Sequence, residues 1–210
     1  DQPPFMWAYD PNIKDYPHDT QMARQLLQQA GWTPGPDGIM TKNGQPLTLV
    51  LVSNNSNVTR RKNSVEIQAM LRQAGINLQI KYFPGDVLFA PVGEGGILQG
   101  GQFDLALAGW YAGMDPDDAS QFTCANVAPN GYNYSRYCSQ AMDAAQKVAL
   151  ENYDIPTRRK AYSQIQQLLH QDVPEIFFYY ERQMHPVSEN FKGFAPSPVA
   201  EAWNAWQWSI

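Results

Sequence analysis

The chain has few charged residues, few cysteines and no long hydrophobic run. Charged side chains make up 17% of its 210 residues, against about 25% in an average globular domain. The 15 basic residues are outnumbered by 20 acidic ones, which excludes the basic stripe of a nucleic-acid-binding protein. No apolar run approaches the roughly 18–20 residues that span a bilayer. The 43% of hydrophobic residues suffice for a core, so we expect a folded chain.

Nucleotide-binding and catalytic motifs are also missing. The glycine-rich run GEGGILQGG at 93–101 lacks the G-K-[ST] ending of a phosphate loop and precedes a predicted strand instead of following one. There is no G-x-S-x-G nucleophile motif and no H-E-x-x-H metal motif. The isolated histidines His18, His170 and His185 are typical of solvated or hydrogen-bonded side chains. We therefore predict no metal, no cofactor and no enzymatic activity.

The two cysteines, Cys124 and Cys138, stand apart from other metal-ligating residue types, so a zinc site is disfavoured. Two interpretations remain at this point: a pair of unrelated thiols, or one local disulfide across a loop rich in Asn, Pro and Gly. A disulfide would stabilise the fold by about 3 kcal/mol and would indicate an oxidising compartment. Because the chain starts at Asp1 without an initiator Met or a signal peptide, we expect it to be processed or cut from a longer protein.

Hydrophobic periodicity predicts an α/β fold with a mainly parallel sheet flanked by helices. The region from 47 to 83 has the pattern of a β-α-β unit, which requires parallel strands and a right-handed crossover. A turn-rich stretch at 33–46 predicts a small hairpin, and 84–102 predicts a short helix and a mobile glycine-rich turn. The predicted helices lie near 19–30, 57–74, 139–151 and 156–171, and the predicted strands lie near 47–53, 76–83, 103–109 and 175–180.

Aromatic and amide side chains follow two of the predicted strands. Trp110 and Tyr111 come directly after one strand, and Asn54 and Asn55 come after another. Open α/β sheets bind ligands at the carboxyl ends of their strands, and aromatic faces with amides suit neutral polar ligands such as peptides and sugars. The alternative for Trp110 is a position in the core.

Three carboxylates, Asp115, Asp117 and Asp118, surround Pro116. They could bind a cation, or serve glycoside hydrolysis with a partner such as Glu181. Capping of a helix that begins near Pro116 is the favoured interpretation, because acidic residues are common in the first turn of helices.

Three sequence blocks resemble a known family. They are YDPNIKDYPHDTQMARQLLQQAGW, FDLALAGWYAGMDPDDASQFTC and NYSRYCSQAMDAA, and their order along the chain is kept. The chain resembles the C-terminal lobe of extracellular solute-binding proteins of family 5, the dipeptide-, oligopeptide- and nickel-binding group of ABC importers. In the dipeptide-binding branch the two cysteines of this pattern pair, which implies a disulfide between Cys124 and Cys138.

The resemblance implies a lobe of the type II periplasmic-binding-protein fold, as a fragment of a two-lobed protein that closes on its ligand. The implied role is capture of an oligopeptide or another oligomeric polar solute in the periplasm or at the cell surface, followed by delivery to an ABC transporter permease. Residues 1–18 would lead in from the missing N-terminal lobe, 19–190 would form the ligand-binding lobe, and 191–210 would return toward the missing lobe. Alternatives are an oligosaccharide-binding member of the same family and a receptor lobe for signalling.

The ligand-binding residues are predicted from their positions after the strands and from the family resemblance. Peptide-binding members carry an Asp a few residues after their G-W pair, and it binds the α-ammonium group of the ligand. Here that position falls on or beside Gly113, in a loop one residue shorter. Either Asp115 takes the role or the ligand has no free α-amine. Nickel is disfavoured because no histidine lies near these loops. The predicted ligand-binding residues are Asn54, Asn55, Trp110, Tyr111, Ala112, Gly113, Asp115 and Tyr134.

Overall fold

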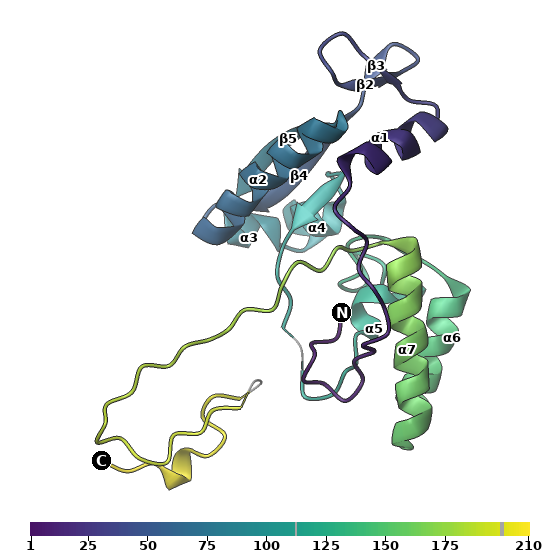
Figure 1. Ribbon diagram of the computed structural model, residues 1–210. Coiled ribbons are helices and arrows are strands. Elements are labelled where there is room, and N and C mark those ends of the chain that lie inside the picture. Colours follow the sequence, from purple (N-terminus) through teal and green to yellow (C-terminus); the bar gives the residue numbers. More distant parts are fainter. Residues whose placement is uncertain (112, 198–199) are drawn as a thin grey trace. The chain divides into compact units, whose positions relative to one another are not determined.

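The computed structural model describes residues 1–111, 113–197 and 200–210 (Figure 1). Ala112, one of the predicted ligand-binding residues, lies outside the described residues. The chain divides into two compact units. We call Lys14–Trp110 with Ser120–Ser139 the sheet unit, and Asp1–Ile13, Tyr111–Ala119 and Gln140–Ile210 together the helical unit.

The sheet unit is built on a parallel sheet with the strand order β5-β4-β6 in the part of the chain that is described. β4 (Thr48–Asn54) pairs with β5 (Asn77–Phe83) along its whole length and with β6 (Leu105–Leu107) in its second half. α2 (Val58–Ala74) connects β4 to β5 and lies along one face of the sheet in Figure 1. The predicted parallel β-α-β unit is therefore confirmed.

Both ends of α2 follow from local sequence signals. The Asn57 side chain accepts a hydrogen bond from the backbone N–H of Arg60 at 2.8 Å and caps the first turn. Gly75 ends the helix at φ 91°, a left-handed conformation that favours glycine, and a Cβ there would lie 2.7 Å from the Met40 Cγ. Between these ends, Ile67 and Leu71 pack against the sheet.

The sheet is covered on both faces, so β4 is buried on both sides. On one face Leu51, Leu78 and Leu107 form a cluster with the apolar side chains of α2. On the other face Val52, Leu88 and Leu98 form a second cluster. Leu88 and Leu98 come from the short helices α3 (Gly85–Leu88) and α4 (Ile97–Gly100), which flank a 3-10 turn at Val92–Glu94. The predicted short helix is thus present as α3, whereas the segment predicted as a glycine-rich turn forms a 3-10 turn and α4.

The predicted hairpin is present beside α1 (Thr20–Gln29), which Asp19 caps through a 2.8 Å bond from the Met22 backbone N–H. β1 (Thr33–Pro34), β2 (Met40–Lys42) and β3 (Gln45–Pro46) pair in antiparallel fashion. Met40 is fully buried and anchors the hairpin, since its backbone N–H also donates to the Gly75 carbonyl at 2.7 Å.

A disulfide between Cys124 and Cys138 closes the loop region at the end of the sheet unit, which settles the choice between free thiols and a bridge. α5 (Ala119–Phe122) and a 3-10 turn at Cys124–Asn126 lie at the start of this region. The buried Asn133 supports the same loop, because its side-chain amide donates to the carbonyls of Thr123 at 3.1 Å and Tyr137 at 2.7 Å.

The helical unit is a helix pair with the N-terminal segment packed on it. α6 (Gln140–Glu151) and α7 (Ile155–Asp172) bury Met142, Ala149 and Ile165 among other side chains. Asp154 caps α7 through a 2.9 Å bond from the Thr157 backbone N–H. The Gln166 side-chain amide donates to the Ala8 carbonyl at 2.8 Å, and Figure 1 shows the N-terminal segment beside α7.

The predicted strand at 175–180 is wrong. Glu175–Tyr180 has no strand partner in the described part of the chain, and the side chains of Ile176 and Phe178 are exposed. Its β-branched and aromatic residues favour extended backbone, but a strand forms only where another strand accepts its hydrogen bonds. Farther along, an antiparallel bridge joins Lys192 to Ser209, and Ala205–Gln207 forms a 3-10 turn.

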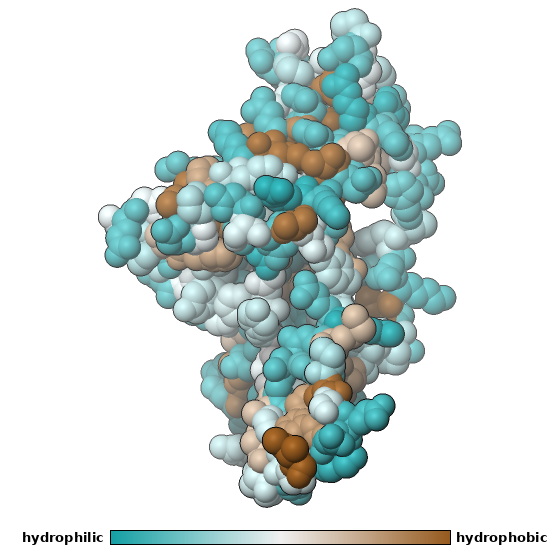
Figure 2. Space-filling model, turned by 90° about the vertical axis from the view of Figure 1, so that its left-hand side faces the viewer, coloured by the Kyte–Doolittle hydropathy of each residue, from teal (hydrophilic) through white to brown (hydrophobic). Residues whose placement is uncertain are grey.

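No helix among the described residues is long and apolar enough to cross a membrane. In Figure 2, hydrophobic side chains form small separate patches on a visible face that is mostly hydrophilic or weakly polar.

Replacing both Cys124 and Cys138 with serine should lower the free energy of unfolding by about 3 kcal/mol, because the bridge constrains a loop in the unfolded chain. Urea unfolding measures the change as a lower midpoint. Reduction of the wild-type protein should reproduce the midpoint of the double variant and leave the variant itself unaffected. An unchanged midpoint in the double variant would contradict the prediction.

Candidate functional site

The strand ends meet at the carboxyl edge of the sheet, as the sequence predicts. The Ser53 hydroxyl is buried and donates to the Leu107 carbonyl at 2.7 Å, which ties the end of β4 to the end of β6. The backbone N–H of Asn55 donates to the Phe83 carbonyl at 2.8 Å and holds the ends of β4 and β5 together. Asn54 and Trp110 therefore belong to adjacent strand ends of one unit.

Aromatic rings lie in a row at this edge. Trp110 is 52% exposed, so it is not a core residue. Its ring centroid lies 5.3 Å from that of Tyr132, which in turn lies 6.3 Å from that of Tyr134. Tyr134 packs against the Val52 cluster, and burial raises the pKa of its hydroxyl above the ordinary value. Tyr134 thus connects the row to the core, while the side chains of Trp110 and Tyr132 are about half exposed.

The side chain of Arg60 also lies at this edge, although the sequence analysis did not include Arg60 among the ligand-binding residues. Its Nη1 donates to the Asn54 Oδ1 at 3.3 Å. Gly109 leaves room for the guanidinium, because a Cβ at that position would lie 2.6 Å from the Arg60 Nη2. The sequence does contain one indication of this contact: Arg60 lies in the first turn of the helix that follows Asn54. We call Asn54, Arg60, Gly109, Trp110, Tyr132 and Tyr134 the edge cluster.

Asp115 lies in the helical unit and is already paired. Its Oδ1 accepts a hydrogen bond from the Arg158 Nη2 at 2.6 Å, and their side chains are 54% and 13% exposed, respectively. The same guanidinium donates through Nε to the Ala149 carbonyl at 2.8 Å and lies over the rings of Trp7 and Tyr162, 5.1 and 5.6 Å from their centroids. Tyr111 and Gly113, two further predicted residues, are exposed on this loop.

The other two carboxylates of the loop also have structural roles. The Asp117 Oδ1 accepts a hydrogen bond from the backbone N–H of Ala119, the first residue of α5, at 3.0 Å. Asp118 is 4% exposed, and its Oδ1 accepts a bond from the Gln146 side-chain amide at 2.6 Å. Burial raises the pKa of Asp118 to about 6.

The described residues contain no group of three side chains arranged to hold a metal ion. Within the same residues, no hydrogen bond or ion pair joins Glu181, the partner considered for hydrolysis, to Asp115, Asp117 or Asp118. The arrangement of these carboxylates therefore gives no support to a hydrolytic site.

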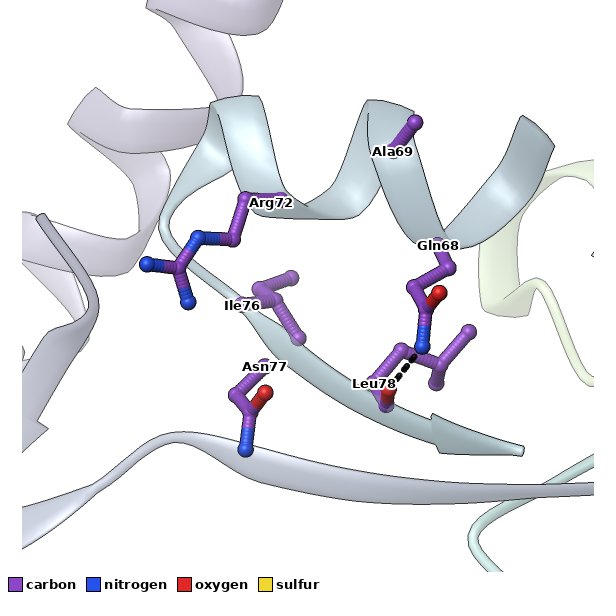
Figure 3. A pocket seen from close by; sticks show the side chains of 6 residues that line it. All are labelled: Gln68, Ala69, Arg72, Ile76, Asn77 and Leu78. Carbon is purple, nitrogen blue, oxygen red and sulfur yellow. Dashed lines mark hydrogen bonds between the residues drawn. The ribbon is translucent and has the colours of Figure 1, made fainter. Parts of the chain in front are cut away.

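Two surface hollows lie away from the edge cluster. One of about 310 Å³ is lined by Gln68 and Arg72 of α2 and by Ile76–Leu78 at the start of β5 (Figure 3). Figure 3 shows Gln68 reaching across it to the Leu78 carbonyl, a 2.7 Å hydrogen bond. This hollow is at the amino end of β5, opposite the carboxyl edge. The other, of about 430 Å³, lies in the helical unit between Ala8–Asn12 and the start of α7 and contains none of the predicted ligand-binding residues.

A parallel sheet that presents aromatic and amide side chains at its carboxyl edge is the arrangement of a ligand-binding α/β lobe. The family profile of bacterial extracellular solute-binding proteins, family 5 (middle region), matches residues 2–132. The chain belongs to this family, and the predicted family is confirmed. Its description as extracellular agrees with the predicted periplasmic or cell-surface location.

The relatives include curated proteins and solved structures. The chain is 28% identical over 209 residues to the oligopeptide-binding protein AppA of Bacillus subtilis, covering 98% of this chain and 37% of the relative. It is 31% identical over 202 residues to a dipeptide-binding protein of Pseudomonas aeruginosa, covering 94% and 35%. The structure of AppA from B. subtilis in complex with a nonapeptide superposes with a TM-score of 0.81 at 27% identity, covering 100% and 41%. The predicted lobe fold is confirmed, and the chain spans about two-fifths or less of these relatives.

The titration of the buried Asp118 carboxyl should make the stability of the protein depend on pH. Its folded pKa of about 6 exceeds the value of about 4 in an unfolded chain, so the folded state binds the proton more tightly. The wild-type protein therefore loses stability from this group as the pH rises from about 4 to about 6. Asp118→Asn keeps an acceptor for Gln146 and removes the titration. We expect the Tm of the variant, relative to the wild type, to increase with pH across this window.

Thermal unfolding at several pH values measures this difference in Tm. Glu94→Gln at an exposed position is the matched control, and its difference from the wild type should stay flat. A difference for Asp118→Asn that is flat or falls with rising pH would contradict the assignment.

Proposed function

We propose that the protein is the substrate-binding component of an ABC importer and that this chain forms its ligand-binding lobe. The observation that carries the proposal is the edge cluster, where half-exposed aromatic rings and an amide gather at the carboxyl edge of a parallel sheet. Membership of the solute-binding family supports a role in capture and in delivery to a membrane permease. A non-enzymatic role is supported by the structural roles of the three loop carboxylates.

The proposed ligand is an oligopeptide or another oligomeric polar solute. Relatives named as oligopeptide-binding and dipeptide-binding proteins support peptides as the leading class. The rings of Trp110 and Tyr132 can stack on peptide groups or on sugar rings, and the Asn54 amide can orient either by hydrogen bonds. Oligosaccharides are therefore the second ligand class to test.

We propose that the complete protein has two lobes and that residues 1–18 and 191–210 connect this lobe to the other one. Exposed aromatic side chains support this division. The rings of Trp203 and Trp206 meet edge to face, and both side chains are at least half exposed. Phe177 and Tyr179 are exposed in the extended segment after α7. Large exposed apolar surface of this kind marks a contact with another protein surface.

Ligand binding can be tested on the complete gene product by a thermal-shift screen of peptides and oligosaccharides. A ligand that binds only the folded protein raises its Tm. Trp110→Ala should weaken the affinity for that ligand by about tenfold or more, because large aromatic side chains dominate binding surfaces. Tyr153→Ala, at a fully exposed aromatic position of the helical unit, is the matched control and should keep the wild-type affinity. A screen without any Tm increase, or equal affinities for the two variants, would count against the proposal.

A further inference from the structure

We propose that the free edge of β5 and the flank of α2 beside it form a docking surface for an extended, acidic peptide segment of a partner protein. The segment pairs with β5 as an added strand and places its carboxylates against Arg61, Arg72 and Lys81. This surface is separate from the edge cluster, so the proposed docking goes beyond ligand capture.

β5 is an edge strand of its sheet. Among the described residues it pairs with β4 alone, in the order β5-β4-β6. The Asn77 backbone N–H donates to the Leu47 carbonyl at 2.9 Å, so the odd-numbered residues of β5 face the neighbouring strand. The backbone N–H and carbonyl groups of Ile80 and Tyr82 therefore point away from the sheet, where a further strand can pair with them.

The start of this edge shows the same outward direction. The Leu78 carbonyl accepts a hydrogen bond from the Gln68 side chain at 2.7 Å instead of from a strand (Figure 3). The hollow of about 310 Å³ lies next to this bond, and Arg72 and Ile76 also line it. A hollow of this size can take one side chain of an added strand. Farther along the strand, the Tyr82 hydroxyl donates to the Arg61 carbonyl at 3.4 Å and places that end of α2 beside β5.

Positive charge is concentrated around this edge. Residues 20–83 carry seven of the 15 basic residues of the chain and only two of its 20 acidic ones. Arg61 and Arg72 are eleven residues apart, which is about three turns, so they lie on the flank of α2 that carries Gln68. Both arginines are exposed, as is Lys81 on β5.

These three cations have no carboxylate partner in the described part of the chain. The Arg72 Nη2 donates to the Asp37 backbone carbonyl at 3.3 Å, and a carbonyl does not compensate a full charge. The flank therefore offers charge-assisted hydrogen bonds to carboxylates of another molecule, which are stronger than bonds between neutral groups.

The same charges decide which strand can be added. Two copies of β5 paired edge to edge would bring Lys81 and the arginines of both copies together, and facing like charges destabilise a strand pair. A strand with Asp or Glu side chains meets the opposite charge instead. Backbone hydrogen bonds to β5 then provide affinity, and the cations together with the hollow provide specificity.

Hydrogen exchange on the complete gene product tests strand addition at Ile80 and Tyr82. The probes are acetyl-Thr-Glu-Val-Glu-Val-Glu-amide and its counterpart with lysine in place of glutamate, each at about 1 mM. We expect the glutamate peptide to slow exchange of both amides by about tenfold or more, because carbonyls of an added strand accept their hydrogen bonds. The lysine peptide should leave both rates unchanged. Unchanged rates with the glutamate peptide would overturn the proposal.

Charge-reversed variants test the cationic flank. Arg72→Glu combined with Lys81→Glu should weaken binding of the glutamate peptide by about tenfold or more and should let the lysine peptide protect the same amides. Lys147→Glu combined with Lys160→Glu changes the net charge equally at exposed positions of the helical unit and should alter the affinity by less than about twofold. Equal effects of the two double variants, or an unchanged peptide preference in the first, would refute the role of the flank.

Other occupants of the edge give different results. Slow exchange at Ile80 and Tyr82 without any peptide would overturn the proposal. A rate that falls with protein concentration would then identify a second copy, and a rate independent of concentration would identify the remainder of the gene product.

The glutamate peptide must also be distinguished from a captured ligand. Trp110→Ala alters the edge cluster and should leave the protection of Ile80 and Tyr82 by this peptide intact. Loss of protection in Trp110→Ala would place the peptide at the edge cluster and overturn the docking surface. Since the test needs no captured ligand, a failure of the proposed function would leave its outcome unaffected.

Discussion

The burial of β4 on both faces is the constraint on which the sheet unit depends. Leu51 points into the cluster under α2, and Val52 points into the opposite cluster formed with α3 and α4. Because side chains alternate along a strand, a shift of one residue in register would exchange these two faces and break both clusters. The register in turn fixes which residues emerge at the carboxyl edge, and the buried bond from Ser53 to the Leu107 carbonyl ties that edge together. The positions of Asn54 and Trp110 are thus a consequence of core packing.

Helix ends were predictable because their causes are local. Asp19 and Asn57 cap helices with their own side chains, and Gly75 supplies the left-handed conformation that ends one. Strands depend on partners far away in the sequence. The predicted strand at 103–109 shortens to Leu105–Leu107, where β4 provides a ladder, and the run at 175–180 has the right composition but no partner among the described residues.

The residues of the candidate site likewise fall into those that the sequence predicts and those that depend on contacts between distant parts of the chain. The topological rule for parallel sheets located Asn54 and Trp110 without knowledge of any side-chain position. Arg60 and Tyr132 were not predicted as part of the edge cluster because the sequence does not show how far a side chain reaches. The Arg60 side chain contacts Asn54 beside Gly109. Tyr132 lies in the loop that the disulfide closes and contacts Trp110 from there. The loop sequence alone could not assign the role of Asp115, since its partner Arg158 lies 43 residues farther along the chain, in α7.

Because only 17% of the residues are charged, each paired or solvent-exposed charge has a large effect on the local electrostatic potential. Although the net charge is −5, each carboxylate of the Asp115–Asp118 segment accepts a hydrogen bond from another part of the protein. In a surface with few charges, a guanidinium such as that of Arg60, whose printed partner among the described residues is the neutral Asn54 amide, affects the local potential more than it would among many ions of both signs. Selectivity for a ligand at the edge cluster would then depend on oxygen acceptors and on aromatic stacking, where the spacing of Trp110 and Tyr132 matters more than the sign of the protein's net charge.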